Sequence, residues 1–430
     1  NPYRVLFWLV LVLAAMFVLR GYATGGIQPV SLITPTPTRT FGSYEEEAKT
    51  HFAAGNLEDA ITAYQRALEV SPNEARLWAE LARIQVYSST QKVSAADRDK
   101  RLKEALDSIN RAVELAPDDS TAHAIRAFVL DWNAGLGGED ADAYLVEAEQ
   151  AAIRALQLDG TNTLALAYYS EILTDQLKVL QALEYIEQAV RRDPELMDVH
   201  RIYAYVKESL RDYEGAIEEY EKALQITPNL TFLHLRIGVT YRVLAADQRK
   251  DYYDRALEYF EQAATINQQL GIRDPLPYIS IAKTYSQLGT FFPAALNIRK
   301  ALEYMPDSAD VYGQTGIIFY KGKNYEGAIE ALKCAVEGCT AVESCKVRRC
   351  TDANNPAIEI TGLPLNDQTV VYYYTYGSAL AGLHRKTNNY CTQAVVILGK
   401  VRAAFREDTI IMNIIEPSIA ICENYGYATP

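Results

Sequence analysis

Six cysteines are the residues of this chain whose type and clustering could support covalent or metal chemistry. All of them fall in the last quarter of the sequence, at Cys334, Cys339, Cys345, Cys350, Cys391 and Cys422. An even number of clustered cysteines predicts disulfide bonds if this part of the chain lies outside the cytosol. We expect up to three disulfides that staple an irregular loop, Gly338 to Gln368, to the C-terminal part of the fold. Fifteen connectivities are possible, and the sequence does not select one.

A zinc site is the alternative chemistry for Cys334, Cys339, Cys345 and Cys350. The spacing disfavours zinc, because structural zinc sites commonly contain cysteine pairs about two residues apart. Here the intervening gaps are four, five and four residues. Free thiols are the third possibility. The chain contains no Cys-x-x-Cys-His sequence, so a covalently attached haem is not indicated, and we expect no cofactor and no metal.

The sequence contains no recognisable catalytic motif. The five histidines are scattered singly, at His51, His123, His200, His234 and His384. The sequence has no G-x-S-x-G, no P-loop, no G-x-G-x-x-G after a strand and no H-E-x-x-H. The many Asp and Glu residues occur where helix surfaces need solvation. The sequence therefore predicts a protein that is not an enzyme and has no small-molecule substrate.

The elements that carry these residues are helices with a recurring pattern of small side chains. Nine segments contain an alanine followed seven residues later by a second alanine, or by valine in the last segment. Seven residues are two helical turns, so both small side chains lie on one face and let a partner helix approach closely. The pairs are Ala60/Ala67, Ala105/Ala112, Ala148/Ala155, Ala182/Ala189, Ala216/Ala223, Ala256/Ala263, Ala294/Ala301, Ala328/Ala335 and Ala394/Val401.

One complete unit is the 34-residue segment from Met197 to Leu230, which has two amphipathic halves separated at Arg211-Asp212 and ends near Pro228. This pattern resembles the tetratricopeptide repeat, and the resemblance extends from about Phe41 to Arg406. It implies an all-α, right-handed superhelical solenoid of about nine helical hairpins. A further helix at Asp408 to Asn424 is expected to cap the exposed end of the array.

The resemblance also implies a concave groove that is lined by the first helices of the repeats and receives an extended peptide or a partner helix. Carried onto this chain, the candidate groove residues are Arg201, Tyr205, Arg242, Lys283 and Tyr320. This mixture of cations and aromatics would suit a peptide with carboxylates. The plainer interpretation is that they are ordinary exposed helix residues.

A second candidate contact is the basic group Lys346, Arg348 and Arg349 in the cysteine-rich segment, which could dock an acidic partner. The plainer interpretation here is a solvated loop. Nearby, Tyr372, Tyr373, Tyr374 and Tyr376 fall within one predicted helix, so some should pack in the core and some could reach an interface.

Near the N-terminus, Val5 to Leu19 is uninterrupted apolar sequence flanked by Arg4 and Arg20. With its tolerant flanks it is long enough to span a membrane as a helix. The rival interpretation is a cleavable signal peptide. We predict retention as a membrane anchor, with the repeats on the extracytoplasmic side, in the periplasm or at the cell surface. The Thr/Pro-rich sequence that follows predicts an extended stalk.

The predicted boundaries are 3–23 for the transmembrane helix, 24–40 for the linker, 41–337 for repeats 1–8, 338–368 for the cysteine-rich insertion, 369–406 for repeat 9 and 407–430 for the capping helix and tail.

The overall charge and the repeats together indicate a protein-binding function. A net charge of −13 repels phosphate backbones, so nucleic acid is not an expected partner. The first hypothesis is a membrane-tethered scaffold that assembles or positions subunits of a membrane or cell-envelope complex. The alternative is a self-assembling structural subunit of an extracellular filament or surface layer. The expected partners are accordingly other proteins or copies of the chain itself.

Overall fold

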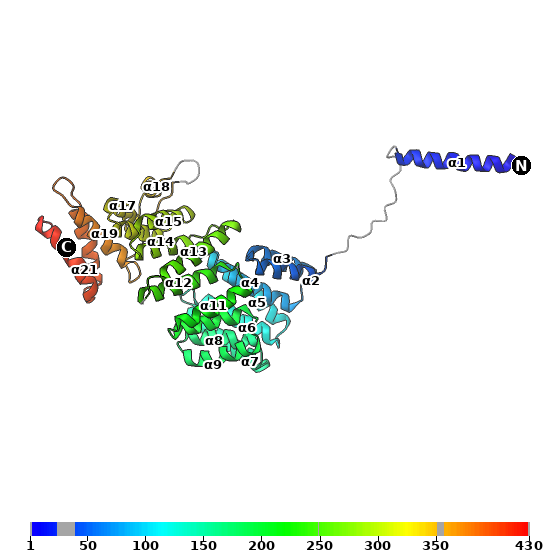
Figure 1. The fold of residues 1–430 in the computed structure, drawn as a ribbon, viewed down its shortest axis with the longest axis horizontal. Helices are drawn as coiled ribbons and strands as arrows, with labels where there is room; N and C mark the ends of the chain where they lie inside the picture. Colours follow the sequence, from blue (N-terminus) through cyan, green and yellow to red (C-terminus); the bar gives the residue numbers. More distant parts are fainter. Residues whose placement is uncertain (1, 24–38, 248, 351–356, 429–430) are drawn as a thin grey trace.

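The protein is an array of helices. The computed structural model describes residues 2–23, 39–247, 249–350 and 357–428, and these ranges contain 21 helices and no strand (Figure 1). The all-α prediction is confirmed. Two isolated backbone bridges, Cys339 with Ile360 and Arg385 with Asn388, are the extended pairings in the described part of the chain.

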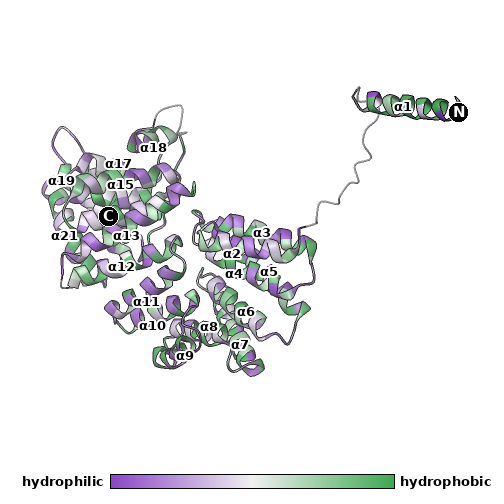
Figure 2. Ribbon diagram, turned by 45° about the vertical axis from the view of Figure 1, so that its right-hand side comes forward, coloured by the Kyte–Doolittle hydropathy of each residue, from purple (hydrophilic) through white to green (hydrophobic). Residues whose placement is uncertain are grey.

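The helix α1, Pro2–Ala23, is apolar on all sides, as the green ribbon in Figure 2 shows. Its 22 residues correspond to about 33 Å of helix, which matches the thickness of a hydrocarbon core. Its side chains from Tyr3 to Leu19 are exposed. The predicted apolar helix is therefore present. Most of the predicted linker, residues 24–38, lies outside the described residues.

Nine hairpins follow, each formed by two consecutive helices that pack against each other. The first helices are α2 (Phe41–Ala53), α4 (Ala75–Ser89), α6 (Ser120–Ala134), α8 (Thr163–Asp175), α10 (Met197–Ser209), α12 (Thr231–Asp247), α14 (Leu276–Gln287), α16 (Ala309–Lys321) and α19 (Val370–Leu383). The second helices are α3 (Leu57–Val70), α5 (Ala95–Leu115), α7 (Ala141–Leu158), α9 (Val179–Arg192), α11 (Tyr213–Ile226), α13 (Tyr252–Gln269), α15 (Phe291–Tyr304), α17 (Tyr325–Val336) and α20 (Cys391–Ala404).

The predicted pairs of small residues lie where these helices touch. All nine pairs are on second helices, and every one of their side chains has an exposed fraction of 0%. A small side chain at these positions permits close approach of the neighbouring helices, whereas a larger one would force the backbones apart. The sequence period thus identified the contact stripe of every hairpin.

Five of the turns inside the hairpins share one backbone feature. The residue two positions before the second helix has a positive φ, between 61° and 78°. Gly55 and Gly289 adopt this left-handed conformation easily because they have no Cβ. Leu177, Arg211 and Lys323 occupy the same position, although the left-handed region costs a non-glycine residue about 1–2 kcal/mol.

The cysteine-rich segment is partly helical, which corrects the expectation of an irregular loop. The helix α18, Ala341–Arg348, forms there because Thr340 and Glu343 make a capping box at its start. The final helix, α21, covers Thr409–Asn424 and follows the predicted capping segment closely. Asp408 caps it by accepting hydrogen bonds from the backbone of Ile410 and Ile411.

Two large hydrophobic cores run through the array. One extends from Ala48 to Tyr259 and the other from Ala264 to Cys422. Within the first, helices far apart in sequence meet: the ring of Tyr87 on α4 stacks on Phe232 of α12, with centroids 6.0 Å apart. We call the helices α2–α12 the closed turn, because the superhelix there brings its first and last helices together.

Candidate functional site

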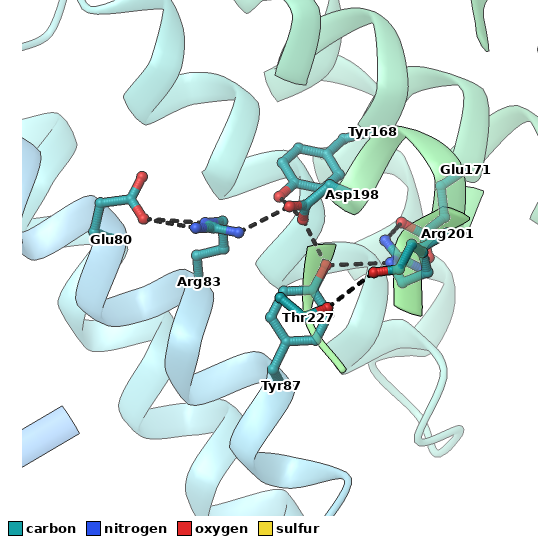
Figure 3. A network of polar contacts seen from close by, with 9 residues as sticks. Glu80, Arg83, Tyr87, Tyr168, Glu171, Asp198, Arg201 and Thr227 are labelled. Carbon is teal, nitrogen blue, oxygen red and sulfur yellow. Dashed lines mark hydrogen bonds and ion pairs between the residues drawn. The ribbon is translucent and has the colours of Figure 1, made fainter. Parts of the chain in front are cut away.

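The concave side of the closed turn is filled by a network of polar side chains from α4, α8 and α10 (Figure 3). Asp198 on α10 is at its centre and has an exposed fraction of 0%. The hydroxyl of Tyr168 donates to Asp198 Oδ1 at 2.6 Å, and the hydroxyl of Tyr87 donates to the same oxygen. Arg83 Nη1 donates to Asp198 Oδ2 at 2.8 Å and also contacts Glu80 through its other nitrogens.

The environment of Asp198 keeps it charged although it is fully buried. Burial alone would raise its pKa. The positive charges of Arg83 and Arg201 and the two tyrosine hydroxyls outweigh burial and lower the pKa of Asp198 below its ordinary value. Because Arg83 and Tyr87 are more than 110 residues away in sequence, this carboxylate joins the second hairpin to the fifth.

Arg201, one of the predicted groove residues, lies inside the same network. Its exposed fraction is 4%, and its guanidinium makes two 2.6 Å hydrogen bonds to the carboxylate of Glu171. The guanidinium also lies over the rings of Phe128 and Trp132, 5.4 and 5.9 Å from their centroids. It is therefore not the ordinary exposed residue of the plainer interpretation. Partner binding by Arg201 stays a prediction, and a partner would have to compete with Glu171 for it.

A cavity of about 530 Å³ remains beside this network, between α5, α6, α8, α10 and α12. Aromatic and apolar side chains form much of its wall, together with three carboxyl groups of α6 and α8 and three arginines, Arg98, Arg201 and Arg236. Tyr205, a second predicted groove residue, lines it and donates a 2.5 Å hydrogen bond to Asp175. Its lining includes Leu102, Asp131, Trp132, Leu136, Asp175, Tyr205, Phe232 and Leu276.

Beyond the closed turn, the concave side carries a smaller cleft between α12, α14 and α16, with a volume of about 250 Å³. Arg242, Lys283 and Lys321 line it. None of these three cations forms an ion pair with the described residues; Arg242 donates to the carbonyl of Ser280 at 3.3 Å. Burial lowers the pKa of both Arg242 and Lys283, and the charge of Arg242 lowers that of Lys283 further.

Tyr320, the last predicted groove residue, is half-buried on α16, where its ring packs edge-on against Tyr325 at 5.4 Å. Four of the five groove candidates are thus distributed over two places, and Tyr320 lines neither of them. Arg201 and Tyr205 are in the closed turn, while Arg242 and Lys283 line the smaller cleft.

Two protein-family models match the chain: a TPR repeat model at residues 48–86 and a tetratricopeptide repeat model at residues 172–230. Both segments lie within the array of hairpins: the first contains α3 and most of α4, and the second contains α9, α10 and α11. The chain belongs to the tetratricopeptide-repeat family.

Characterised relatives share only part of their length with this tetratricopeptide-repeat protein. Human DnaJ homolog subfamily C member 7 is 26% identical over 196 residues, which cover 43% of this chain and 38% of the relative. A TPR repeat-containing protein of Methanocaldococcus jannaschii is 25% identical over 197 residues and 32% of its own length. Regulator of microtubule dynamics protein 1 of Pongo abelii is 27% identical over 154 residues and 48% of its length.

Solved structures show the same fold over most of the chain. The human IFIT1 dimer with PPP-AAAA has a TM-score of 0.53 at 17% identity and covers 90% of this chain and 83% of that chain. A monomeric mutant of IFIT1 with m7Gppp-AAAA has a TM-score of 0.54, also at 17% identity, over 89% of this chain and 80% of that chain. At this identity the likeness concerns the fold alone.

The histidines of the tetratricopeptide array have structural contacts. His123, His200 and His234 each lie six residues after the proline that ends the preceding repeat, and a ring nitrogen contacts the carbonyl oxygen of that proline. Trp78 and Tyr312 occupy the same register and donate to the equivalent carbonyls. This position thus satisfies a carbonyl group that the end of the second helix leaves unpaired.

The cysteines of the last repeats are paired locally. The structure joins Cys334 to Cys339, Cys345 to Cys350 and Cys391 to Cys422, with Cα–Cα distances of 4.6, 5.2 and 5.4 Å. Only the first two pairs involve the insertion. The second lies wholly within the insertion and the third connects α20 to the capping helix α21, so only Cys334–Cys339 joins the insertion to a repeat as predicted. No group of side chains suited to a metal ion occurs in the described residues.

The basic group of the insertion is less available than its sequence suggested. Lys346 forms an ion pair with Glu330 of α17, and the exposed fraction of Arg348 is 6%. Arg349 ends α18 in the left-handed conformation. Of the tyrosines that follow, Tyr372, Tyr373 and Tyr376 are buried, with exposed fractions of 6%, 6% and 1%, and Tyr374 is half-buried.

Sequence reasoning missed the buried partners of Arg201. Asp198, Arg83 and Tyr87 were not singled out, because their positions in the helices do not differ from those of surface residues. The type of residue at this position gave no signal either, because the second residues of α4 and α16, Arg76 and Asp310, are also charged.

Proposed function

We propose that the protein is a non-enzymatic scaffold, tethered to a membrane by α1, that binds an acidic segment of a partner protein in the cleft between α12, α14 and α16. The observation that carries the proposal is a set of three cations that line one concave cleft and form no ion pair with the described residues, Arg242, Lys283 and Lys321. A carboxylate ligand would supply the missing charge.

The electrostatics of the cleft support an anionic ligand. Burial penalises the charged forms of Arg242 and Lys283 and lowers the pKa of both. Each therefore gains more from a bound carboxylate than a fully solvated cation would. Asp310 is the acid that interacts with Lys283, but its carboxylate already accepts from Tyr372 and Gln314.

Binding to a defined acidic peptide tests this proposal. The full chain in a non-ionic detergent would be titrated against a fluorescent Glu-rich peptide and its Gln-rich counterpart, with fluorescence polarisation as the measurement. We expect Arg242→Gln and Lys283→Gln each to lower the affinity for the Glu-rich peptide about tenfold or more, because each variant loses a charge-assisted hydrogen bond. The control Arg66→Gln/Lys400→Gln removes one arginine and one lysine that are exposed elsewhere.

Equal binding of both peptides, or equal effects of the cleft variants and the control, would refute the proposal.

The membrane part is tested separately by flotation with liposomes. The full chain should float with the vesicles, and a chain that begins at residue 41 should stay in the dense fraction. Labelling of intact cells with a membrane-impermeant amine reagent would test the extracytoplasmic location of the repeats.

A second candidate is self-assembly into a filament or surface layer. The observation that favours it is the outer face of α21, where Ile410, Ile414 and Ile421 have exposed fractions of 73%, 38% and 40%. The end of a repeat array is normally covered by a polar surface. Light scattering with mass spectrometry of gently extracted particles distinguishes the candidates, because a filament contains copies of one chain and a scaffold complex contains unlike subunits.

A further inference from the structure

We infer that the cavity inside the closed turn is a binding site for a small organic ammonium ion, held by the carboxyl groups of Asp131 and Asp175. This site is separate from the cationic cleft of the proposed function, and it has the opposite charge preference. The argument rests on an unpaired buried carboxyl oxygen, on the balance of charges around the cavity and on its apolar wall.

Asp131 provides the first observation. Its exposed fraction is 5%, and it lines the cavity. Its Oδ1 atom is buried and has no hydrogen-bond partner among the described residues. A buried carboxyl oxygen without a partner costs free energy, so such atoms are rare unless something else satisfies them. A donor that enters the cavity would remove this cost.

The charges around the cavity leave this carboxyl group without a cation. On α8, Glu171 is fully engaged with Arg201 of α10 through two hydrogen bonds. Asp175 accepts a hydrogen bond from the neutral hydroxyl of Tyr205. Asp131 and Asp175 therefore face each other with no ion pair to either one in the described chain, while Arg201, the arginine whose charge acts on both, is already paired with Glu171.

Two further cations line the cavity, but each interacts with a different carboxyl group. Arg236 of α12 pairs with Glu208, and the charge of Arg98 on α5 acts on Asp274. Burial together with the neighbouring carboxylates raises the pKa of both Asp131 and Asp175, so that the pair retains a proton at a pH where a free carboxyl has lost it. An entering ammonium ion would take the place of that proton.

The wall of the cavity indicates what the rest of the ligand must be. Leu102, Leu136, Phe232 and Leu276 line it, so a ligand with a short apolar stem would bury that stem against them. A volume of about 530 Å³ is within the range of small-molecule sites, roughly 300–1,000 Å³. A primary ammonium ion on an aliphatic chain fits both requirements.

The experiment is isothermal titration calorimetry of the full chain in non-ionic detergent with n-pentylammonium chloride. The neutral isostere 1-pentanol controls for apolar binding and for partition into micelles. We expect saturable binding of the ammonium ion, at least tenfold tighter than that of the alcohol. Between pH 5 and pH 8 the affinity should rise, because the ionised carboxyl pair is the form that binds. Titrations in phosphate and HEPES buffers, which contain no primary ammonium ion and differ in their heat of ionisation, should differ in heat because binding releases a proton.

Three variants make the result specific. Asp131→Asn and Asp175→Asn keep the shape of the side chain and remove its charge, so each should lower the affinity at least tenfold and abolish the difference between the two buffers. Asp107→Asn, an exposed position on α5, should behave as the parent. Circular dichroism would establish that each variant is folded. Absence of saturable heat with pentylammonium, or unchanged affinity in both carboxyl variants, would overturn the inference.

Discussion

The buried carboxylate of Asp198 should be one of the most important single groups for the stability of the closed turn. Replacing Asp198 with Asn removes the negative charge that faces Arg83 and weakens the hydrogen bonds from the hydroxyls of Tyr87 and Tyr168. Removing one partner of a buried ion pair commonly costs about 3–5 kcal/mol. Arg83 keeps Glu80 as a second partner, so the lower end of this range is expected.

Urea unfolding of the full chain in detergent would measure the effect, with tryptophan fluorescence as the signal. Trp78 on α4 and Trp132 on α6 both lie in the closed turn, whereas the third tryptophan, Trp8, lies in α1. With an m-value of about 3 kcal/mol per molar urea, a loss of about 3 kcal/mol in the free energy of unfolding lowers the midpoint by about 1 M. The exposed control Asp107→Asn should change the free energy by less than about 0.5 kcal/mol.

A double-mutant cycle separates the network from the general cost of a core substitution. Tyr87→Phe removes one hydroxyl that donates to Asp198. If the two side chains act together, the double variant should lose at least about 0.5–1 kcal/mol less than the sum of the single variants. Additive losses, or an Asp198→Asn midpoint equal to that of the control, would refute the stabilising role of this contact between α4 and α10.

Three further outcomes follow from other features. Burial raises the pKa of Asp274 to about 6 from 3.8, so the folded state retains a proton that the unfolded state releases. The free energy of unfolding of the protein should therefore fall by up to about 3 kcal/mol from this group as the pH rises from 4 to 7. In urea titrations at several pH values, Asp274→Asn should reduce this dependence on pH; an unchanged dependence would contradict the prediction. Leu177 has a φ of 62° and an exposed fraction of 86%, so Leu177→Gly should relieve strain and raise the free energy of unfolding by about 1 kcal/mol, whereas a lower Tm would show that the turn is not strained. Cys391→Ser/Cys422→Ser opens a link across 31 residues and should cost about 3–4 kcal/mol in urea unfolding under oxidising conditions; a variant as stable as the oxidised parent would argue against the bond.

The repeated hairpins could be predicted from sequence because their determinants are local. The pair Ala216 and Ala223 lies within one helix, and Pro228 ends that helix, so a single 34-residue window contains the whole pattern. The same reasoning located the capping helix. It did not reveal α18, because its eight residues are too few to show a clear period and its capping box falls among cysteines.

The sites were harder to predict because they depend on the curvature of the array. Arg201 and Arg242 are both arginines on first helices, and from the sequence both were predicted to line the groove. The structure buries Arg201 against Glu171 and leaves Arg242 beside Lys283 in a cleft. The difference arises from how far the superhelix closes, which is the sum of many small rotations between neighbouring repeats.

The contact between Arg83 and Asp198 has a consequence for synthesis of the chain. Most repeat proteins can fold one unit at a time, because each unit contacts only its neighbours. Here 115 residues separate the two partners, which raises the contact order of this half of the molecule. At about 5–20 residues per second, the ribosome needs roughly 6–23 s to deliver Asp198 after Arg83. During that interval the inner side of the second hairpin is complete in sequence but lacks Asp198, and Arg83 has only Glu80 of its own helix as a partner, so this half of the chain is the part that should depend most on chaperones while it is being made.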